Sequence, residues 1–466
     1  MAKTKQLDLT KGSVMKQLIA FAMPILFANV LQHLYNVADK VVVGQFAQDG
    51  TVALAAVGST AAALGMILNL ILGFTAGTNV ICANYRGARK PKALRTCMHS
   101  SMMLGVVSGL IVAVLGIVVS RPLLRLMSTP ENVMDSATLY MRIYLAGSPV
   151  AMIYNFGASI MRAHGDTKRP MYILMVSGLV NVLLNLVLVI FFHMDVAGVA
   201  IATVASQVVS AAVIVYLLFS PKGEYKMSFK ELRMEKSSVQ AVVRVGIPCG
   251  LNNIVFSFSN MTVQSALNSF NSAVVIAGKT AATDIVNLTY QIIASFAMAC
   301  TSFAGQCYGA GDYKRIDKLC KDAILTCWGC LVVVAGLITI FQDPLLWLFN
   351  SDPEVIEAGR GILMINSWGY MLYAVCDLVL CCSRGMGKTS VPTILSFAGI
   401  CVPRIVWAMA VFPFFRTVEF LFLCYPISWF INSVLQIIYY VRVRKQVDQK
   451  AALRLQKQEA EKLAAQ

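Results

Sequence analysis

Apolar stretches of roughly 20 residues or more recur along the whole sequence, and each is long enough to cross about 30 Å of hydrocarbon as a helix. Only 13% of the residues are charged, whereas about a quarter are charged in a soluble protein. This pattern excludes an ordinary water-soluble enzyme and predicts an all-α polytopic membrane protein. The twelve predicted transmembrane helices cover residues 15–40, 52–80, 97–120, 133–158, 170–192, 196–219, 240–268, 275–303, 320–341, 358–381, 391–413 and 418–441.

Basic residues are unevenly distributed among the predicted loops. Because the number of crossings is even, both termini lie on the same side of the membrane as the even-numbered loops. These segments hold 31 of the 39 Lys and Arg residues. By the positive-inside rule, we expect an integral plasma (inner) membrane protein with both termini cytoplasmic. The net charge of +16 follows from these loops, so we expect no nucleic-acid binding.

The sequence contains an internal repeat at an offset of about 222 to 224 residues. Residues 24–46 align with 248–270, and MRAHGDTKRP from Met161 aligns with CSRGMGKTSVP from Cys382. Each half has six crossings, so we expect two pseudo-symmetric lobes of the same orientation, related by an axis near the membrane normal. The predicted organisation is an N-terminal six-helix lobe (1–220), a cytoplasmic linker (221–238), a C-terminal six-helix lobe (239–442) and a cytoplasmic basic tail (443–466).

One carboxylate interrupts the first apolar stretch. At about 100° per residue, Asn29, Gln32, Asn36 and Asp39 fall within an arc of roughly 80° on a helix. Polar side chains in a membrane are costly and normally face a bundle interior or a water-filled cavity, so this stripe predicts the wall of a pathway. The seventh helix carries a similar stripe, but Val263 stands at the position that matches Asp39. Only the N-terminal half therefore supplies an acid.

An acid inside a membrane helix suits exchange of a proton. Burial disfavours the charged form of a carboxyl group, so a proton and a cationic substrate would compete for Asp39. The alternative is that Asp39 lies at the hydrated outer end of its helix and is neutralised by Lys40. Adjacent residues on a helix point about 100° apart, which weakens that pairing.

Motifs for other chemistry are incomplete. GKT at 387–389 looks like the end of a phosphate-binding loop, but Cys382 stands where that motif requires its first Gly. The four His residues lie in separate segments and show no metal-ligand spacing. We therefore expect neither an enzyme nor a bound cofactor.

Four separate segments carry motifs in a fixed order. They are LYNVADKVVVGQF from Leu34, IYNFGASIMRAHGDTKRPM from Ile153, GVAIATVASQ from Gly198 and FAGQCYGAG from Phe303. In this order they resemble the multidrug and toxic compound extrusion (MATE) family. The resemblance implies two six-helix lobes around a V-shaped cavity, and export of cationic or amphiphilic compounds in exchange for H⁺ or Na⁺.

The resemblance also implies a cation site in the N-terminal lobe. The family's first-helix acid falls on Asp39, its fifth-helix Asn on Asn181 and its sixth-helix Thr on Thr203. Where many members have a second Asp, this chain has Asn185, and the seventh-helix acid of some Na⁺-coupled members is absent. These departures favour proton coupling through Asp39, although the same oxygen atoms could ligate Na⁺. The predicted cation-coupling residues are Asp39, Asn181, Asn185 and Thr203.

Polar, aromatic and Met side chains are candidates for a substrate cavity, since soft and flat groups adapt to many ligands. Ordinary helix packing explains each of them equally well. The predicted substrate-cavity residues are Gln32, Tyr35, Asn36, Phe256, Asn260, Met261, Tyr290 and Gln291. Two further intramembrane charges, Asp377 and Arg404, are expected to pair with each other or to have a secondary role in coupling or gating.

The resulting hypothesis is a monomeric secondary antiporter that exports organic cations or amphiphiles by alternating access. Its expected partners are these small molecules and membrane lipid. An exporter of the major facilitator class fits less well, because the loop 83–95 has five basic residues and no acid. The alternative that stays open is a lipid or lipid-linked precursor flippase of the same superfamily.

Overall fold

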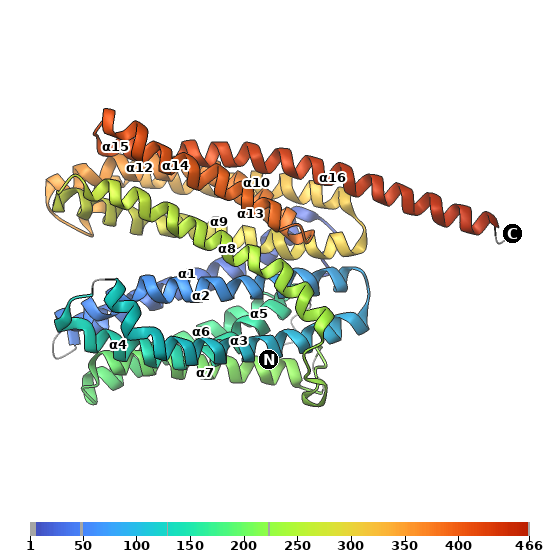
Figure 1. Cartoon of the computed structure of the whole chain (residues 1–466), viewed down its shortest axis with the longest axis horizontal. Coiled ribbons are helices and arrows are strands. Elements are labelled where there is room, and N and C mark those ends of the chain that lie inside the picture. Colours follow the sequence, from blue (N-terminus) through green and yellow to red (C-terminus); the bar gives the residue numbers. More distant parts are fainter. Residues whose placement is uncertain (1–5, 47–49, 128, 222–223, 465–466) are drawn as a thin grey trace. The chain divides into compact units, whose positions relative to one another are not determined.

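Helices make up nearly all of the computed structural model, which describes residues 6–46, 50–127, 129–221 and 224–464 (Figure 1). In the first half they are α1 (Val14–Phe46), α2 (Gly50–Gly87), α3 (Pro91–Leu126), α4 (Glu131–Ala146), α5 (Ser148–Ala163), α6 (Lys168–Leu186) and α7 (Asp195–Phe219). In the second half they are α8 (Lys236–Asn268), α9 (Ala273–Ala310), α10 (Tyr313–Ile340), α11 (Gln342–Trp347), α12 (Pro353–Gly385), α13 (Ser390–Ser396), α14 (Val402–Val406), α15 (Val418–Phe422) and α16 (Cys424–Ala464). Short π-helical turns extend α6, α13 and α14.

Eleven helical segments of the described chain are long and apolar enough to cross a membrane. The fourth predicted crossing is divided between α4 and α5, which have 16 residues each and meet at Gly147. Pro149 lies in the first turn of α5. Backbone N–H groups in the first turn of a helix have no partner within the helix, so a proline, which lacks this group, is tolerated there. With this divided crossing, the fold is the predicted one of twelve transmembrane helices in two pseudo-symmetric six-helix lobes.

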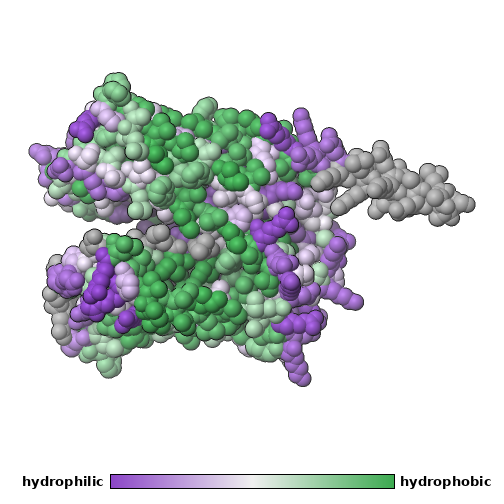
Figure 2. All heavy atoms as spheres, viewed as in Figure 1, coloured by the Kyte–Doolittle hydropathy of each residue, from purple (hydrophilic) through white to green (hydrophobic). Residues whose placement is uncertain are grey.

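The surface of each lobe carries a belt of hydrophobic residues, and hydrophilic residues gather at its two ends (Figure 2). On α3, for example, Leu110, Val114 and Val118 are all exposed. Because residues four apart share one face of a helix, these side chains form a continuous apolar stripe. A stripe of this kind is unfavourable in water and suits contact with lipid.

The contacts divide the chain into two compact units. Unit 1 comprises Met1–Lys11 and Ile19–Ile254, and unit 2 comprises Gly12–Leu18 and Val255–Gln466. The start of α1 thus packs with unit 2, where Arg315 donates to the Gly12 carbonyl (2.8 Å) and to Gln17 Oε1 (3.0 Å). Conversely, the first half of α8 packs within unit 1. The boundaries at residues 18/19 and 254/255 therefore fall inside α1 and α8, and none falls in the predicted linker.

Within unit 1, α2 and the first half of α8 approach each other through glycines four residues apart. A Cβ atom at Gly73 would lie 2.5 Å from the carbonyl oxygen of Gly246, and one at Gly77 would lie 3.0 Å from the backbone N of Gly246. Gly250 faces the same contact, since its backbone N is close to Gly73. Small residues with this spacing let two helix backbones touch inside a membrane.

The described part of the predicted linker is bound along unit 1. The Ser228 N–H donates to His99 Nε2 (3.0 Å). The Ser100 hydroxyl donates to the Arg233 carbonyl and accepts from the Glu235 N–H, each at 3.1 Å. These bonds satisfy backbone groups that a free tether would leave to water, so this segment is a docked part of unit 1.

The loop after α5 contains a buried histidine. His164 is 4% exposed, its Nδ1 lies 2.8 Å from the Ile160 carbonyl, and Tyr225 contacts its ring edge-on. Burial, assisted by the charge of Arg86, lowers the pKa of His164 from 6.5 to about 4. Burial also raises the pKa of the neighbouring Asp166, whose carboxylate accepts a hydrogen bond from the Tyr225 hydroxyl (3.1 Å).

We expect His164 to make the protein sensitive to acid between pH 6.5 and pH 4. Its folded pKa lies below the unfolded value, so its contribution to stability is present above pH 6.5 and is lost as the pH falls towards 4. The difference corresponds to about 3 kcal/mol in the free energy of unfolding. The raised pKa of Asp166 acts in the opposite direction, because its contribution is lost as the pH rises through the folded value.

The contribution of His164 to stability can be measured by comparing the melting temperatures of the wild type and of His164→Asn across this pH range. The variant should be less stable near neutral pH and should show a flatter dependence on acid. If the melting temperatures of the two proteins depended on pH in the same way, His164 would not be the source of the acid sensitivity.

In unit 2, α9 and α12 pack together where Gly278 meets Gly359, and a Cβ atom at Gly278 would lie 2.8 Å from the backbone N of Gly359. α16 packs on α12 and continues as a helix to Ala464, as the Ala-, Glu- and Lys-rich sequence of the tail favours. Arg444 on α16 holds both carboxylate oxygens of Asp317 at 2.8 Å. This bidentate ion pair ties the start of the tail to α10.

Candidate functional site

The four predicted cation-coupling residues lie together in unit 1. Asn185 Nδ2 donates to the Asp39 carboxylate and so joins α6 to α1. Asn181, one turn earlier on α6, accepts a hydrogen bond from Asn185 (3.5 Å) and donates to Thr203 Oγ1 on α7 (3.4 Å). Three helices thus meet in one chain of hydrogen bonds, which we call the Asp39 network.

Helix geometry explains how α6 contributes two members of this network. Residues four apart face the same way, so Asn181 and Asn185 both turn inward, and they are 5% and 0% exposed. The Thr203 hydroxyl donates to the Val199 carbonyl (2.9 Å), which orients its oxygen to accept from Asn181. A π-helical turn, Val187–Phe191, begins just after Asn185 and ends the regular ladder of α6 at the network.

The Asp39 network contains one carboxylate and an unused acceptor. Asn185 Oδ1 is buried and has no hydrogen-bond partner in the described structure. The salt bridges found among the described residues do not include Asp39, and the side chain of Lys40 lies outside the described part. A carboxylate can take up a proton, and carboxylate, amide and hydroxyl oxygens can together ligate a hard cation. The residues present therefore fit either coupling ion.

Two tyrosines near Asp39 were not predicted from the sequence. Tyr140 and Tyr144 lie on α4 with their ring centroids 6.1 Å apart, and both are close enough to Asp39 to sense the charge of its carboxylate. Their spacing of four residues places them on one helix face. A pair of hydroxyl-bearing rings at this spacing in an apolar helix is the signal that could have identified them.

The predicted substrate-cavity residues of α1 differ in their surroundings. Tyr35 lies against α6, where its hydroxyl donates to the Met175 carbonyl (3.3 Å) and its ring fills the space left by the absent side chain of Gly178. Gln32 and Asn36 are exposed on the same helix. Tyr35 is therefore held in place by packing, and the two amides are the accessible groups.

Two of the corresponding residues of unit 2 belong to a cluster of aromatic rings. Phe256 meets Tyr373 edge-on at 5.9 Å, and Tyr290 lies 6.0 Å from the same ring. Met261 is 64% exposed, and Gln291 is half-buried. A cavity shared by the two lobes stays a prediction.

Arg404 is the largest fully buried side chain of the protein's described part, with 1% exposure. Its Nε donates to Ser428 (3.0 Å), and its Nη1 donates to Ser259 (3.2 Å) and to Asn260 Oδ1 (2.9 Å). The guanidinium carbon also lies 4.2 Å from the centroid of the Tyr425 ring. Neutral oxygens and an aromatic face thus surround a permanent positive charge.

The expected pair between Asp377 and Arg404 is not formed. No salt bridge in the described chain joins them, and the charge that acts on Asp377 is Arg384, two turns further along α12. Arg404 instead inserts between α8 and α16, where hydroxyl and amide groups accept its hydrogen bonds. The sequence placed both charges in the membrane but could not give the rotation of one helix relative to the other.

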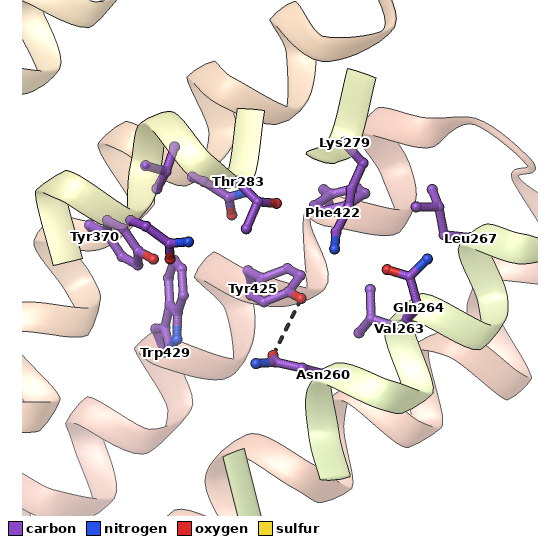
Figure 3. Close-up of a pocket in the computed structure, with 13 residues that line it drawn as sticks. Asn260, Val263, Gln264, Leu267, Lys279, Thr283, Tyr370, Phe422, Tyr425 and Trp429 are labelled. Atoms are coloured by element: carbon purple, nitrogen blue, oxygen red, sulfur yellow. Dashed lines mark hydrogen bonds between the residues drawn. The ribbon is translucent and has the colours of Figure 1, made fainter. Parts of the chain in front are cut away.

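A pocket of about 160 Å³ lies within unit 2 (Figure 3). Tyr425 donates to Asn260 Oδ1 (3.4 Å) at its wall, and Lys279 reaches into it from α9. Of the predicted substrate-cavity residues, Asn260 belongs to this wall. The residues that line the pocket are Asn260, Val263, Gln264, Leu267, Lys279, Thr283, Val286, Asn287, Asn366, Tyr370, Phe422, Tyr425 and Trp429.

The fold and these two polar sites define a class of protein. Twelve membrane-crossing helices in two repeated lobes, with a buried polar network in one lobe and a polar pocket in the other, are the layout of a membrane transporter. A family model described as MatE matches residues 24–187 and again residues 248–409. The two matches to one model agree with the internal repeat. The chain belongs to the MATE family of transporters.

Individual relatives are consistent with this assignment. The chain is 28% identical over 404 residues to the "Probable multidrug resistance protein YoeA" of Bacillus subtilis (84% of this chain, 85% of the relative). It is 24% identical over 331 residues to a "FAD transporter" of Shewanella oneidensis (69% and 72%). A solved structure of a multidrug resistance MATE family transporter in an outward-facing conformation has the same fold, with a TM-score of 0.89, 22% identity and coverage of 96% of this chain and 100% of that one.

Proposed function

We propose that this protein is a secondary antiporter of the plasma membrane that exports organic cations or amphiphiles in exchange for H⁺. The Asp39 network carries the proposal, because it presents one carboxylate that forms no salt bridge among the described residues. A proton or a cationic substrate can each neutralise that charge. Their competition for one group couples export of one to import of the other.

Asn185 supports both protonation states of Asp39. When Asp39 is ionised, its oxygen accepts from Asn185 Nδ2, as in the structure. When Asp39 is protonated, its new O–H can donate to Asn185 Oδ1, which is buried without a partner in the described chain. Protonation thus exchanges one hydrogen bond for another and changes the contact between α1 and α6. We propose that this change accompanies alternating access.

Na⁺ is the other coupling ion that the donor set fits, since the oxygens of Asp39, Asn181 and Thr203 suit a hard cation. The relative named as a FAD transporter widens the candidate substrates to anionic compounds. A flippase for lipid or a lipid-linked precursor is the alternative function. One assay distinguishes H⁺ from Na⁺ as the coupling ion and an antiporter from a flippase.

The test uses purified full-length protein in proteoliposomes that contain a fluorescent cationic dye and a labelled lipid. We expect dye movement against its gradient when a pH gradient is imposed and little movement with a Na⁺ gradient alone. Response to Na⁺ alone would replace H⁺ by Na⁺ as the coupling ion. Movement of lipid without movement of dye would overturn the antiporter in favour of the flippase.

The proposed orientation places both termini and the docked linker in the cytoplasm. We expect a Cys introduced as Lys226→Cys to react with a membrane-impermeant maleimide only after the cells are opened. Cys330 is the exposed native thiol of the described chain, so a Cys330→Ser background removes its signal. Labelling of Lys226→Cys in intact cells would reverse the orientation.

A further inference from the structure

The unit 2 pocket carries positive charge and no acidic side chain. Lys279 is one of the lining residues, and Asp and Glu are absent from the lining. Behind this wall lies Arg404, whose guanidinium is bonded to Asn260 and faces the Tyr425 ring. Neither cation forms a salt bridge within the described residues. The exposed carboxylate of Asp284, five residues beyond Lys279 on α9, acts on the Lys279 charge but does not line the pocket.

The internal repeat allows the positive charge at the unit 2 pocket to be compared with the equivalent region of unit 1. Val263, the counterpart of Asp39, lines the unit 2 pocket. The offset of 222 residues that aligns Pro170 with Pro392 places Arg404 over Val182, the neighbour of Asn181. Equivalent regions of the two lobes therefore hold an acid in one case and a cation in the other. A buried cation in a membrane protein is costly and normally marks a functional site.

Two polar groups at the wall of this pocket lack partners. Trp429 is 4% exposed, and its indole Nε1–H has no acceptor among the described atoms. Asn366 is 8% exposed, and its Oδ1 is also unpaired. Rotation of the Asn366 amide would present its N–H groups at the same place. The Lys279 ammonium, on the other side of the Tyr425 ring from Trp429, is the group suited to an oxygen anion, because charged groups form the stronger hydrogen bonds (Figure 3).

The remaining wall is aromatic. The Trp429 ring lies 5.2 Å from Tyr370 and 5.5 Å from Tyr425, and Phe422 stacks on Tyr425 at 5.6 Å. A cavity of about 150 Å³ is known to hold one benzene ring. At about 160 Å³, this pocket has room for a single ring with its substituent and not for a whole drug-sized molecule.

We propose that the unit 2 pocket binds the aromatic carboxylate end of a substrate, with Lys279 on the carboxylate and the aromatic wall, which includes Trp429, on the ring. Arg404 supports this site through Asn260 and Tyr425 and makes it unfavourable for a cation. The proposal goes beyond the antiport function, which depends on the Asp39 network of unit 1. It adds anionic and zwitterionic aromatic compounds to the molecules that this protein takes up into its second lobe.

Binding of two matched probes to the purified full-length protein tests the proposal. Para-fluorobenzoate and para-fluorobenzylammonium share one ring and differ in the sign of their charge, and fluorine NMR reports the binding of each. We expect saturable binding of the benzoate and no competition from the ammonium compound. Equal binding of both probes would overturn the proposal, because a merely aromatic pocket would not distinguish them.

Variants locate the binding. Lys279→Gln should weaken benzoate binding about tenfold or more, while Lys279→Arg should largely retain it. Lys314→Gln removes the same charge from an exposed position on α10 and should have no effect. Trp429→Ala removes one ring of the aromatic wall and should also weaken binding. Unchanged affinity in both Lys279→Gln and Trp429→Ala, with the fold confirmed by circular dichroism, would place the benzoate elsewhere and overturn the proposal.

Asp39→Asn separates this proposal from the antiport function. We expect it to bind benzoate as the wild type does. Loss of benzoate binding in Asp39→Asn would contradict a site confined to unit 2. Absence of benzoate binding in the wild type, together with intact dye efflux, would reject the anion site and leave the antiport function standing.

Discussion

Replacing Asp39 with Asn is expected to reduce dye efflux driven by a pH gradient to the level of protein-free liposomes. Asn has nearly the shape of Asp and can still accept a hydrogen bond from Asn185, so the contact between α1 and α6 should persist. What the variant loses is the negative charge and the ability to exchange a proton. The expected result is a folded protein of normal melting temperature that does not couple dye movement to the gradient.

Asp284→Asn is the matched control, since it removes an exposed acid from α9 by the same substitution and should retain efflux. Asn185→Asp provides a second comparison, because two carboxylates in contact hold more negative charge than a single proton can neutralise. We expect that variant to respond more strongly to a Na⁺ gradient than the wild type does. Full pH-driven efflux by Asp39→Asn would show that the Asp39 carboxylate is not needed for coupling.

The helices and the repeat could be predicted because both depend on composition and spacing along the chain. Stretches of about 20 apolar residues leave few structures other than a membrane helix. The division of the fourth crossing at Gly147 was not predicted, although Gly147, Ser148 and Pro149 form a local signal for a break between helices. Apolar composition reports that a segment enters the membrane and not whether its helix is continuous.

The Asp39 network was accessible from the sequence for two reasons. The resemblance named its four residues, and the spacing of Asn181 and Asn185 put both amides on one helix face. The partners of Arg404 were not accessible, because they depend on how α14 is rotated against α8 and α16. A sequence shows which charges enter the membrane, and tertiary packing decides which groups meet them.

The double substitution Gly73→Ala and Gly77→Ala is expected to destabilise the protein more than any other change of two methyl groups in α2. Both added Cβ atoms would fall within 3.0 Å of backbone atoms of α8, and a backbone cannot rotate away as a side chain can. The two helices must therefore separate. Overpacking of this kind costs about 1 to 3 kcal/mol at a single site. We expect a large fall in melting temperature and a loss of folded protein at extraction.

Gly58→Ala with Gly65→Ala is the matched control on the same helix, because a Cβ atom at either position meets nothing within 4 Å. There the better helix propensity of Ala, worth up to about 1 kcal/mol per residue, should leave stability equal or improved. The comparison separates backbone contact from helix propensity, since both proteins gain two methyl groups in α2. Equal stability of the two double variants would mean that α2 and α8 do not touch through these glycines. In that case the first half of α8 would not be anchored in unit 1 by this contact.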